Sequence, residues 1–214
     1  VKVPARNCVP VPHSVSDELA ALTEPLSISM QALRVAGDVR GHRVLVMGPG
    51  TIGQGIAALA RRAGARQVVV SGFDDEARFK TLRRMGFDQL VDVSHQRIDV
   101  KQQPLAQGVA PYLDGGHFDT VFEATGVPET INDALALLRR DGVIVVTGIH
   151  ARPLALDLTQ LVRRQQQLRG SFRPPESDWP AALELMSDLG ATLAPMVSHV
   201  LPLSQALEGF ALAD

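Results

Sequence analysis

The sequence contains only one cysteine, Cys8, in 214 residues. A single thiol excludes an internal disulfide framework and a zinc site built from several thiolates of this chain alone. Long apolar runs are also missing, because no stretch approaches the roughly 18 to 20 residues that a membrane span needs. These absences lead us to expect a soluble, cytoplasmic protein from a reducing compartment, with no membrane partner.

An excess of one charge is absent as well. The 21 Lys and Arg residues are balanced by 23 Asp and Glu residues, which leaves a formal net charge of -2. A chain without a basic field attracts phosphate backbones weakly, so nucleic acid is not an expected partner. The hydrophobic content of 45% is that of an ordinary globular protein, large enough here for one domain or for a domain plus part of another.

A glycine pattern stands out in the first half of the chain. Residues 44–47 form the apolar run Val-Leu-Val-Met, and Gly48, Gly50 and Gly53 follow it with the spacing G-x-G-x-x-G. In a dinucleotide-binding turn such glycines allow a tight bend, close approach of a pyrophosphate and packing of the next helix on the strand. The spacing alone also fits an ordinary βα turn. The buried strand before it and the alanine-rich helix expected after it favour the dinucleotide site.

Apolar periodicity predicts alternating strands and helices along most of the chain. Beyond the glycine turn and its two flanking elements, we expect strands at residues 67–72, 90–93, 120–126, 143–148 and 168–172, and helices at 14–22, 26–35, 75–85, 105–113 and 128–139. The proline-rich residues 1–11 are expected to be extended. This alternation indicates an α/β protein with a doubly wound parallel sheet.

Several motifs together resemble those of medium-chain dehydrogenases. They are Glu24-Pro25-Leu26-Ser27, the glycine turn at residues 48–53, Phe122-Glu123-Ala124-Thr125-Gly126, Gly170-Ser171-Phe172-Arg173 and Pro195-Met196-Val197-Ser198-His199. Their order and spacing are most similar to the zinc-dependent sorbitol (polyol) and threonine dehydrogenase branch, along nearly the whole chain. The fold that this resemblance implies is a Rossmann fold.

The resemblance implies that the chain is the C-terminal, cofactor-binding part of such an enzyme. Residues 25–190 would form the NAD(P)-binding domain, and residues 1–24 and 191–214 would be remnants of a GroES-like catalytic domain, the second a truncated return segment. The expected function is hydride transfer between a secondary alcohol or polyol and NAD(P), in a homodimer or homotetramer. The missing N-terminal domain would hold the catalytic zinc, which lowers the pKa of the bound alcohol, so this part alone is expected to be inactive.

Two other functions remain open. One is a non-catalytic NAD(P)-binding sensor or regulatory module, and the other is a zinc-free, quinone reductase-like member of the same superfamily, which Glu24 and Arg173 make less favourable. Sequence upstream of Val1 discriminates among these functions, because the zinc enzyme requires a preceding cysteine and a His-Glu pair.

The choice between NAD and NADP depends on the end of the second strand, where a dinucleotide fold usually places an acid that binds the adenosine ribose. By comparison with the family, this position is Gly72, which cannot bind a hydroxyl through a side chain. Asp74 or Asp75 could replace the acid if the loop turns back, although both also suit a helix N-cap. Alternatively, Ser71 and Gly72 leave room for a 2'-phosphate with Arg78 as its partner, so both cofactors stay open.

The remaining candidates lie at strand ends or are implied by the resemblance. Ile149, Ser171 and Phe172 would hold the nicotinamide amide through their backbone, and Arg173 would touch cofactor and substrate. Glu24 would lie near or on the catalytic zinc, although from the residues alone it is better explained as a solvated first-turn carboxylate. The six histidines show no metal-binding spacing, so no metal ligand is expected within this chain otherwise. The full expected cofactor set is Gly48, Gly50, Thr51, Ile52, Gly53, Ser71, Gly72, Asp74, Arg78, Thr125, Gly126, Gly148, Ile149, Ser171, Phe172 and Arg173.

Overall fold

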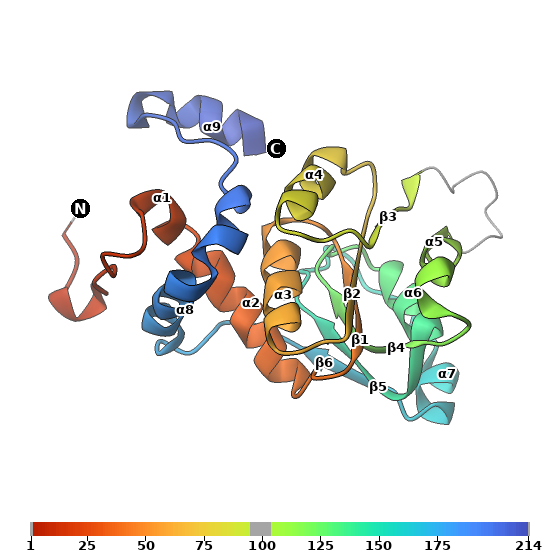
Figure 1. Ribbon diagram of the computed structural model, residues 1–214. Coiled ribbons are helices and arrows are strands. Elements are labelled where there is room, and N and C mark those ends of the chain that lie inside the picture. Colours follow the sequence, from red (N-terminus) through yellow and green to blue (C-terminus); the bar gives the residue numbers. More distant parts are fainter. Residues whose placement is uncertain (1, 95–103, 214) are drawn as a thin grey trace.

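Within residues 2–94 and 104–213, which the computed structural model describes, six parallel strands form one sheet (Figure 1). Their order is β3-β2-β1-β4-β5-β6. β2 and β3 therefore follow on one side of β1, and after a crossover β4, β5 and β6 follow on its other side. The strands are β1 Arg43–Met47, β2 Gln67–Gly72, β3 Leu90–Asp92, β4 Phe118–Glu123, β5 Leu138–Val146 and β6 Gln167–Gly170. This topology confirms the predicted doubly wound α/β sheet.

Helices connect the strands and cover both faces of the sheet (Figure 1). The α-helices are α1 Asp17–Ala20, α2 Thr23–Ala36, α3 Thr51–Arg62, α4 Glu76–Arg84, α5 Pro104–Leu113, α6 Thr130–Leu137, α7 Leu158–Arg163, α8 Asp178–Leu193 and α9 Ala206–Ala213. Short 3-10 turns lie at Ala5–Asn7, Ala194–Met196 and Leu203–Gln205. In the part of the chain that is described, no helix is long and apolar enough to cross a membrane.

The alternation of side chains along each strand divides the core into two clusters. Val44 and Val46 of β1 point into the cluster covered by α2, α3, α4 and α8. Leu45 and Met47 point into the cluster covered by α5, α6 and α7. Because β1 is buried on both faces, it is apolar throughout after Arg43, which explains why periodicity alone identified it.

Several boundaries differ from the sequence-based prediction. The predicted helix at 128–139 ends at Leu137, and β5 begins at Leu138 instead of residue 143. Leu138 is fully buried and pairs with Phe118, and the register then shifts before Thr120, so an irregular strand replaces the last helical turn. The predicted strand at 120–126 ends at Glu123, which leaves residues 124–126 in a loop.

Two segments were described incompletely by the sequence. Helix α7 was not predicted, because only six residues form it, with Asp157 as the N-cap that accepts a hydrogen bond from the Gln160 amide at 2.9 Å. The proline-rich start contains the 3-10 turn Ala5–Asn7 and pairs with no strand among the described residues. The N-terminal segment lies beside α8, and α9 lies beyond the C-terminal end of α8, both away from the sheet (Figure 1).

Candidate functional site

The three glycines between β1 and α3 serve different purposes. Gly48 has a φ of 102°, and a Cβ placed on it would lie 2.8 Å from the carbonyl oxygen of Ala124. A Cβ on Gly53 would lie 1.9 Å from the Gly48 carbonyl oxygen. A Cβ on Gly50 would meet nothing within 4 Å. Packing therefore requires glycine at 48 and 53, whereas the protein itself leaves space beside Gly50.

The N-terminus of α3 begins at this open glycine. Gly50 is the N-cap, and no side chain caps the helix there. Four amides at a helix start lack partners within the helix, and together with the helix dipole they favour an anion. Gln54 is buried and donates from Nε2 to the Pro49 carbonyl at 2.8 Å, which fixes the turn. Sequence reasoning missed Gln54, although a polar amide residue beside the apolar stretch at residues 56–60 was a signal in the sequence.

A cavity of about 640 Å³ lies beside the turn, at the carboxyl ends of the strands. The strand order changes direction between the parallel strands β1 and β4, and open α/β sheets bind ligands in the crevice at such a switch point. Of the predicted residues, Gly48, Gly50, Ser71, Gly72, Arg78 and Thr125 line the cavity; the others of that set do not. The wall also contains Met47, Pro49, Phe73, Asp75, Val93, Leu105, Ala124, Val127, Glu129, Thr130 and Asp133.

The loop after β2 turns back toward the strand end and brings Asp75, rather than Asp74, into the wall of the cavity. Asp75 Oδ2 lies 2.9 Å from the position of a Cβ on Gly72 and accepts a hydrogen bond from the Phe73 amide at 3.1 Å. Its Oδ1 is 2.6 Å from Arg78 Nη1. Asp74 is exposed with a φ of 54°. A carboxylate thus lies beside Gly72, where the strand residue itself has no side chain.

Two carboxylates on the α6 side of the cavity have shifted pKa values in opposite directions. Burial raises the pKa of Asp133 above its ordinary value. The pKa of Glu129 is lowered, chiefly by a hydrogen bond with its backbone, with Arg152 as a further cause. Glu129 is exposed, so of these two cavity carboxylates it is Asp133 whose charged form is disfavoured by burial.

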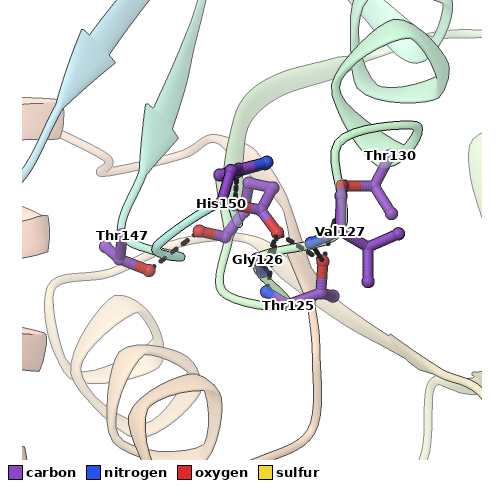
Figure 2. Close-up of polar contacts among 7 residues, drawn as sticks. Thr125, Gly126, Val127, Thr130, Thr147 and His150 are labelled. Atoms are coloured by element: carbon purple, nitrogen blue, oxygen red, sulfur yellow. Dashed lines mark hydrogen bonds and ion pairs between the residues drawn. The ribbon is translucent and has the colours of Figure 1, made fainter. Parts of the chain in front are cut away.

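Glu123, the last residue of β4, joins two loops and was missed as a site residue by sequence reasoning. Its side chain is fully buried. Its Oε1 accepts hydrogen bonds from the Thr125 amide at 2.7 Å, the Thr125 hydroxyl at 2.5 Å and the Gly126 amide at 2.9 Å. Its Oε2 lies 3.0 Å from His150 Nε2. Figure 2 shows Thr125, Gly126 and His150 close together, on the loops that follow β4 and β5.

The residues predicted for the nicotinamide end lie along the ends of β5 and β6. Ile149 and Phe172 are 83% and 74% exposed. The Ser171 amide donates to the Val146 carbonyl at 2.8 Å, and its Oγ is buried without a partner in the described structure. Arg173 is exposed with a φ of 50°. These residues lie at the same carboxyl edge of the sheet as the cavity, although none of them lines the cavity.

Glu24 lies apart from the cavity, in the first turn of α2. It is exposed, and its backbone carbonyl accepts a hydrogen bond from Ser27 Oγ at 2.6 Å. Across residues 2–94 and 104–213, no three His, Cys, Asp or Glu side chains are grouped so that they could hold a metal ion. The described residues therefore do not provide a zinc site by themselves.

The strand order and the glycine turn at the β1/β4 switch point define a Rossmann fold of the dinucleotide-binding class. Residues 51–188 match the family model of the zinc-binding dehydrogenases. The chain belongs to this family, which confirms the resemblance inferred from its motifs.

Individual relatives agree with this assignment. The chain is 31% identical to sorbitol dehydrogenase of Bos taurus over 206 residues, covering 96% of this chain and 56% of the relative. It is 30% identical to L-threonine 3-dehydrogenase of Idiomarina loihiensis over 209 residues, covering 97% and 58%. The chain thus spans little more than half the length of these curated relatives.

Solved structures show the same fold. L-idonate 5-dehydrogenase from Escherichia coli superposes with a TM-score of 0.71 at 28% identity, covering 86% of this chain and 49% of that protein. An alcohol dehydrogenase from E. coli CFT073, solved with NADH, superposes with a TM-score of 0.83 at 21% identity, covering 99% and 60%.

Proposed function

We propose that the chain binds NAD(H) or NADP(H) and forms the cofactor-binding portion of a zinc-type alcohol or polyol dehydrogenase. The observation that carries the proposal is the space beside Gly50, which is at once the N-cap of α3 and part of the cavity wall at the switch point. Tight packing accounts for Gly48 and Gly53, but no atom of the described residues lies near enough to a Cβ at residue 50 to require glycine there. Close approach of a pyrophosphate to the backbone does require it.

The chain's own residues have separate tasks in this proposal. Gly50, Thr51 and Ile52 present the first amides of α3 to the pyrophosphate. The backbone at Ile149 and Phe172 orients the nicotinamide, the ring that accepts or donates the hydride when the cofactor is bound. Arg173, exposed at the end of β6, reaches both cofactor and substrate in the assembled enzyme.

Within this proposal, we assign NAD as the preferred cofactor. The Asp75 carboxylate lies beside Gly72 and is available to accept the adenosine ribose hydroxyls. The same carboxylate would repel a 2'-phosphate, and it already pairs with Arg78, the cation that a phosphate would need. Asp74 is exposed outside the cavity and has no part in this assignment.

The zinc chemistry of the proposed enzyme belongs to residues other than those described here. No group of described side chains fits the ion, and Glu24 is a single exposed carboxylate. We therefore assign Glu24 a place near the zinc only in the complete enzyme. The substrate, a small alcohol or polyol, is proposed from the names of the relatives, which include sorbitol and L-threonine dehydrogenases.

Assembly is the last part of the proposal. β6 is an edge strand among the described residues, and Leu168 on it is 41% exposed. An exposed edge pairs readily with the same strand of a second copy. We propose that homodimers or homotetramers form through β6.

Isothermal titration of the 214-residue chain with NADH tests the function. The proposal expects saturable binding near one site per chain, without alcohol oxidation by this chain even when zinc is added. Absence of binding contradicts the cofactor site. Zinc-supplemented oxidation of an alcohol by the chain alone contradicts its assignment as a partial enzyme. Binding combined with an upstream sequence that lacks a cysteine and a His-Glu pair would contradict the zinc enzyme and favour a sensor module or a zinc-free member of the superfamily.

A further inference from the structure

We propose that Glu123 is a positioning residue that fixes the nicotinamide end of the cofactor site by joining the loops at residues 124–127 and 147–150. This inference rests on the proposed cofactor function. The side chain of Glu123 is fully buried at the end of β4 and does not line the cavity. It would therefore act on the cofactor only through the two loops.

The hydrogen bonds of Glu123 reach both loops. On the side of residues 124–127, its Oε1 accepts from the Thr125 amide and hydroxyl and from the Gly126 amide. On the side of residues 147–150, its Oε2 contacts His150 Nε2. Its backbone carbonyl accepts from the Thr147 hydroxyl at 2.8 Å and from the Thr147 amide at 2.8 Å. In Figure 2, Thr125 and Gly126 lie close to His150, and Thr147 lies on the other side of His150.

The two loops also touch directly, so a change in one is transmitted to the other. A Cβ on Gly126, whose φ is 69°, would lie 2.9 Å from the Ile149 carbonyl oxygen. A Cβ on Gly148 would lie 2.3 Å from the Gly126 amide nitrogen and 2.6 Å from Glu123 Oε2. With Glu123 between them, the two loops lie so close that only glycine fits at residues 126 and 148. The backbone of Ile149, proposed to face the nicotinamide, is part of this contact.

His150 is the donor that connects the second loop. We assign the hydrogen of this contact to Nε2, the arrangement in which the carboxyl group of Glu123 accepts from His150 as it does from Thr125 and Gly126. The other ring nitrogen, Nδ1, is buried and has no partner in the described structure. Burying an unpartnered nitrogen is unfavourable, so the ring's position is explained by its contact with Glu123 rather than by satisfaction of both nitrogens.

Substitutions at His150 separate positioning from folding. The proposal predicts that His150→Leu, which removes the donor, weakens NADH binding by about tenfold, the scale of one hydrogen bond to a charged group. ADP-ribose has the same adenosine and pyrophosphate but lacks nicotinamide, and its affinity is expected to change less than about twofold. His150→Gln retains an N–H near the position of Nε2 and is expected to restore NADH binding. Calorimetry of the unmodified chain and of both variants with the two ligands gives the six affinities.

Glu123→Gln is the stronger variant, because its amide group replaces one acceptor oxygen by a donor that faces other donors. It is expected to weaken NADH binding more than ADP-ribose binding. Asp119→Asn is the matched control, because Asp119 lies on the same strand, β4, at its other end. Its carboxylate accepts hydrogen bonds from the Arg43 amide at 2.7 Å and from Arg139 Nε at 2.7 Å. This control is expected to lower the free energy of unfolding without changing the ratio of the two affinities.

The outcomes distinguish this inference from the function on which it rests. If the unmodified chain binds neither ligand, the cofactor proposal fails. If the chain binds both, and His150→Leu lowers both affinities equally or neither, the positioning role of Glu123 is wrong. Should Glu123→Gln fail to fold, the comparison of His150→Leu with His150→Gln still decides the matter.

Discussion

Gly50 and Gly53 belong to the same motif, but the structure predicts opposite consequences for substituting them. Gly53→Ala places a methyl 1.9 Å from the Gly48 carbonyl oxygen, so the backbone must shift, at a cost of about 1–3 kcal/mol in the free energy of unfolding. The Cβ of a residue at position 50 would meet no atom within 4 Å, and φ there is an ordinary -66°, so we expect Gly50→Val to lose less than about 1 kcal/mol of unfolding free energy and to lose NADH binding. Urea unfolding and calorimetry measure the two effects.

Ala191→Val on α8 is a matched control, because residue 191 is exposed and outside the cavity. It introduces the same valine side chain in place of a small residue and should leave NADH affinity unchanged. NADH binding by Gly50→Val at the affinity of the unmodified chain would show that the pyrophosphate does not approach this glycine.

Asp75→Ser is expected to shift cofactor preference from NAD toward NADP. The substitution removes the acceptor beside Gly72 and releases Arg78 for a 2'-phosphate, which should change the ratio of the two affinities by about tenfold or more. Adding Arg78→Ala should cancel the gain for NADP. Fluorescence titration with NADH and NADPH gives the ratio. A large, NADP-specific loss in Arg78→Ala alone would contradict the assignment, since it would mean that Arg78 already serves a phosphate.

Single residues were the level at which the sequence was least informative. The motif located Gly48, Gly50 and Gly53, because glycine requirements are local. The sequence offered both Asp74 and Asp75 and placed Asp74 in the expected cofactor set, because only the backward turn of the loop brings Asp75 to the cavity instead. Glu123 was quoted as part of a motif, but its role depends on His150, 27 residues later, and on a strand pairing that no local pattern reveals.

The contact between α2 and α8 provides a test at the level of secondary-structure elements. Arg34 Nη2 lies 2.6 Å from Oδ1 of Asp178, whose side chain is 4% exposed. Arg34→Ala leaves this carboxylate buried without its cation and should cost about 1–3 kcal/mol of unfolding free energy. Arg62 and Asp188 form a comparable pair, 2.9 Å apart, but both are largely exposed, so Arg62→Ala should cost less than about 1 kcal/mol. Equal losses in urea unfolding would contradict the importance of burial.

Elements with strong periodicity were predicted well, and elements decided by tertiary packing were not. β1 was recognised because burial on both faces leaves a continuous apolar run in its sequence. α3 was recognised because its alanine-rich apolar stretch ends before a glycine. The boundary at Leu138 was wrong because an apolar residue at helical spacing is equally suited to a buried strand, and pairing with Phe118 decides for the strand. Helix α7 is too short for its periodicity to be visible.

The stability of the whole molecule should depend on pH through Asp133. Burial raises its folded-state pKa above the unfolded value, so the folded state bears the cost of the buried charge once pH exceeds the folded pKa. Below the unfolded pKa of about 3.9 both states are protonated and this cost is absent. Asp133→Asn is therefore expected to stabilise the fold at pH 7, by an amount that disappears as pH falls below about 4.

Urea unfolding at several pH values measures this difference, and Asp88→Asn at an exposed aspartate serves as the control. A stabilisation by Asp133→Asn that is the same at low and neutral pH would contradict an electrostatic origin.

At the level of the whole molecule, the α/β class and the parallel sheet followed from alternation and right-handed crossovers. The strand order did not, because alternation is compatible with more than one doubly wound order. That order places the glycine turn after β1 beside the loop after β4, and both line the cavity.

The central claim is that a dinucleotide binds in the cavity at the carboxyl edge, with its pyrophosphate at the start of α3. An amide-resolved NMR titration of the 214-residue chain with NADH tests it most directly. We predict the largest shifts at residues 48–54, 71–78 and 124–127. A second cavity, of about 540 Å³, lies between the N-terminal segment and α8, lined by Arg6 and Trp179 among others. Shifts confined to that second cavity, or none at saturating NADH, would contradict the claim.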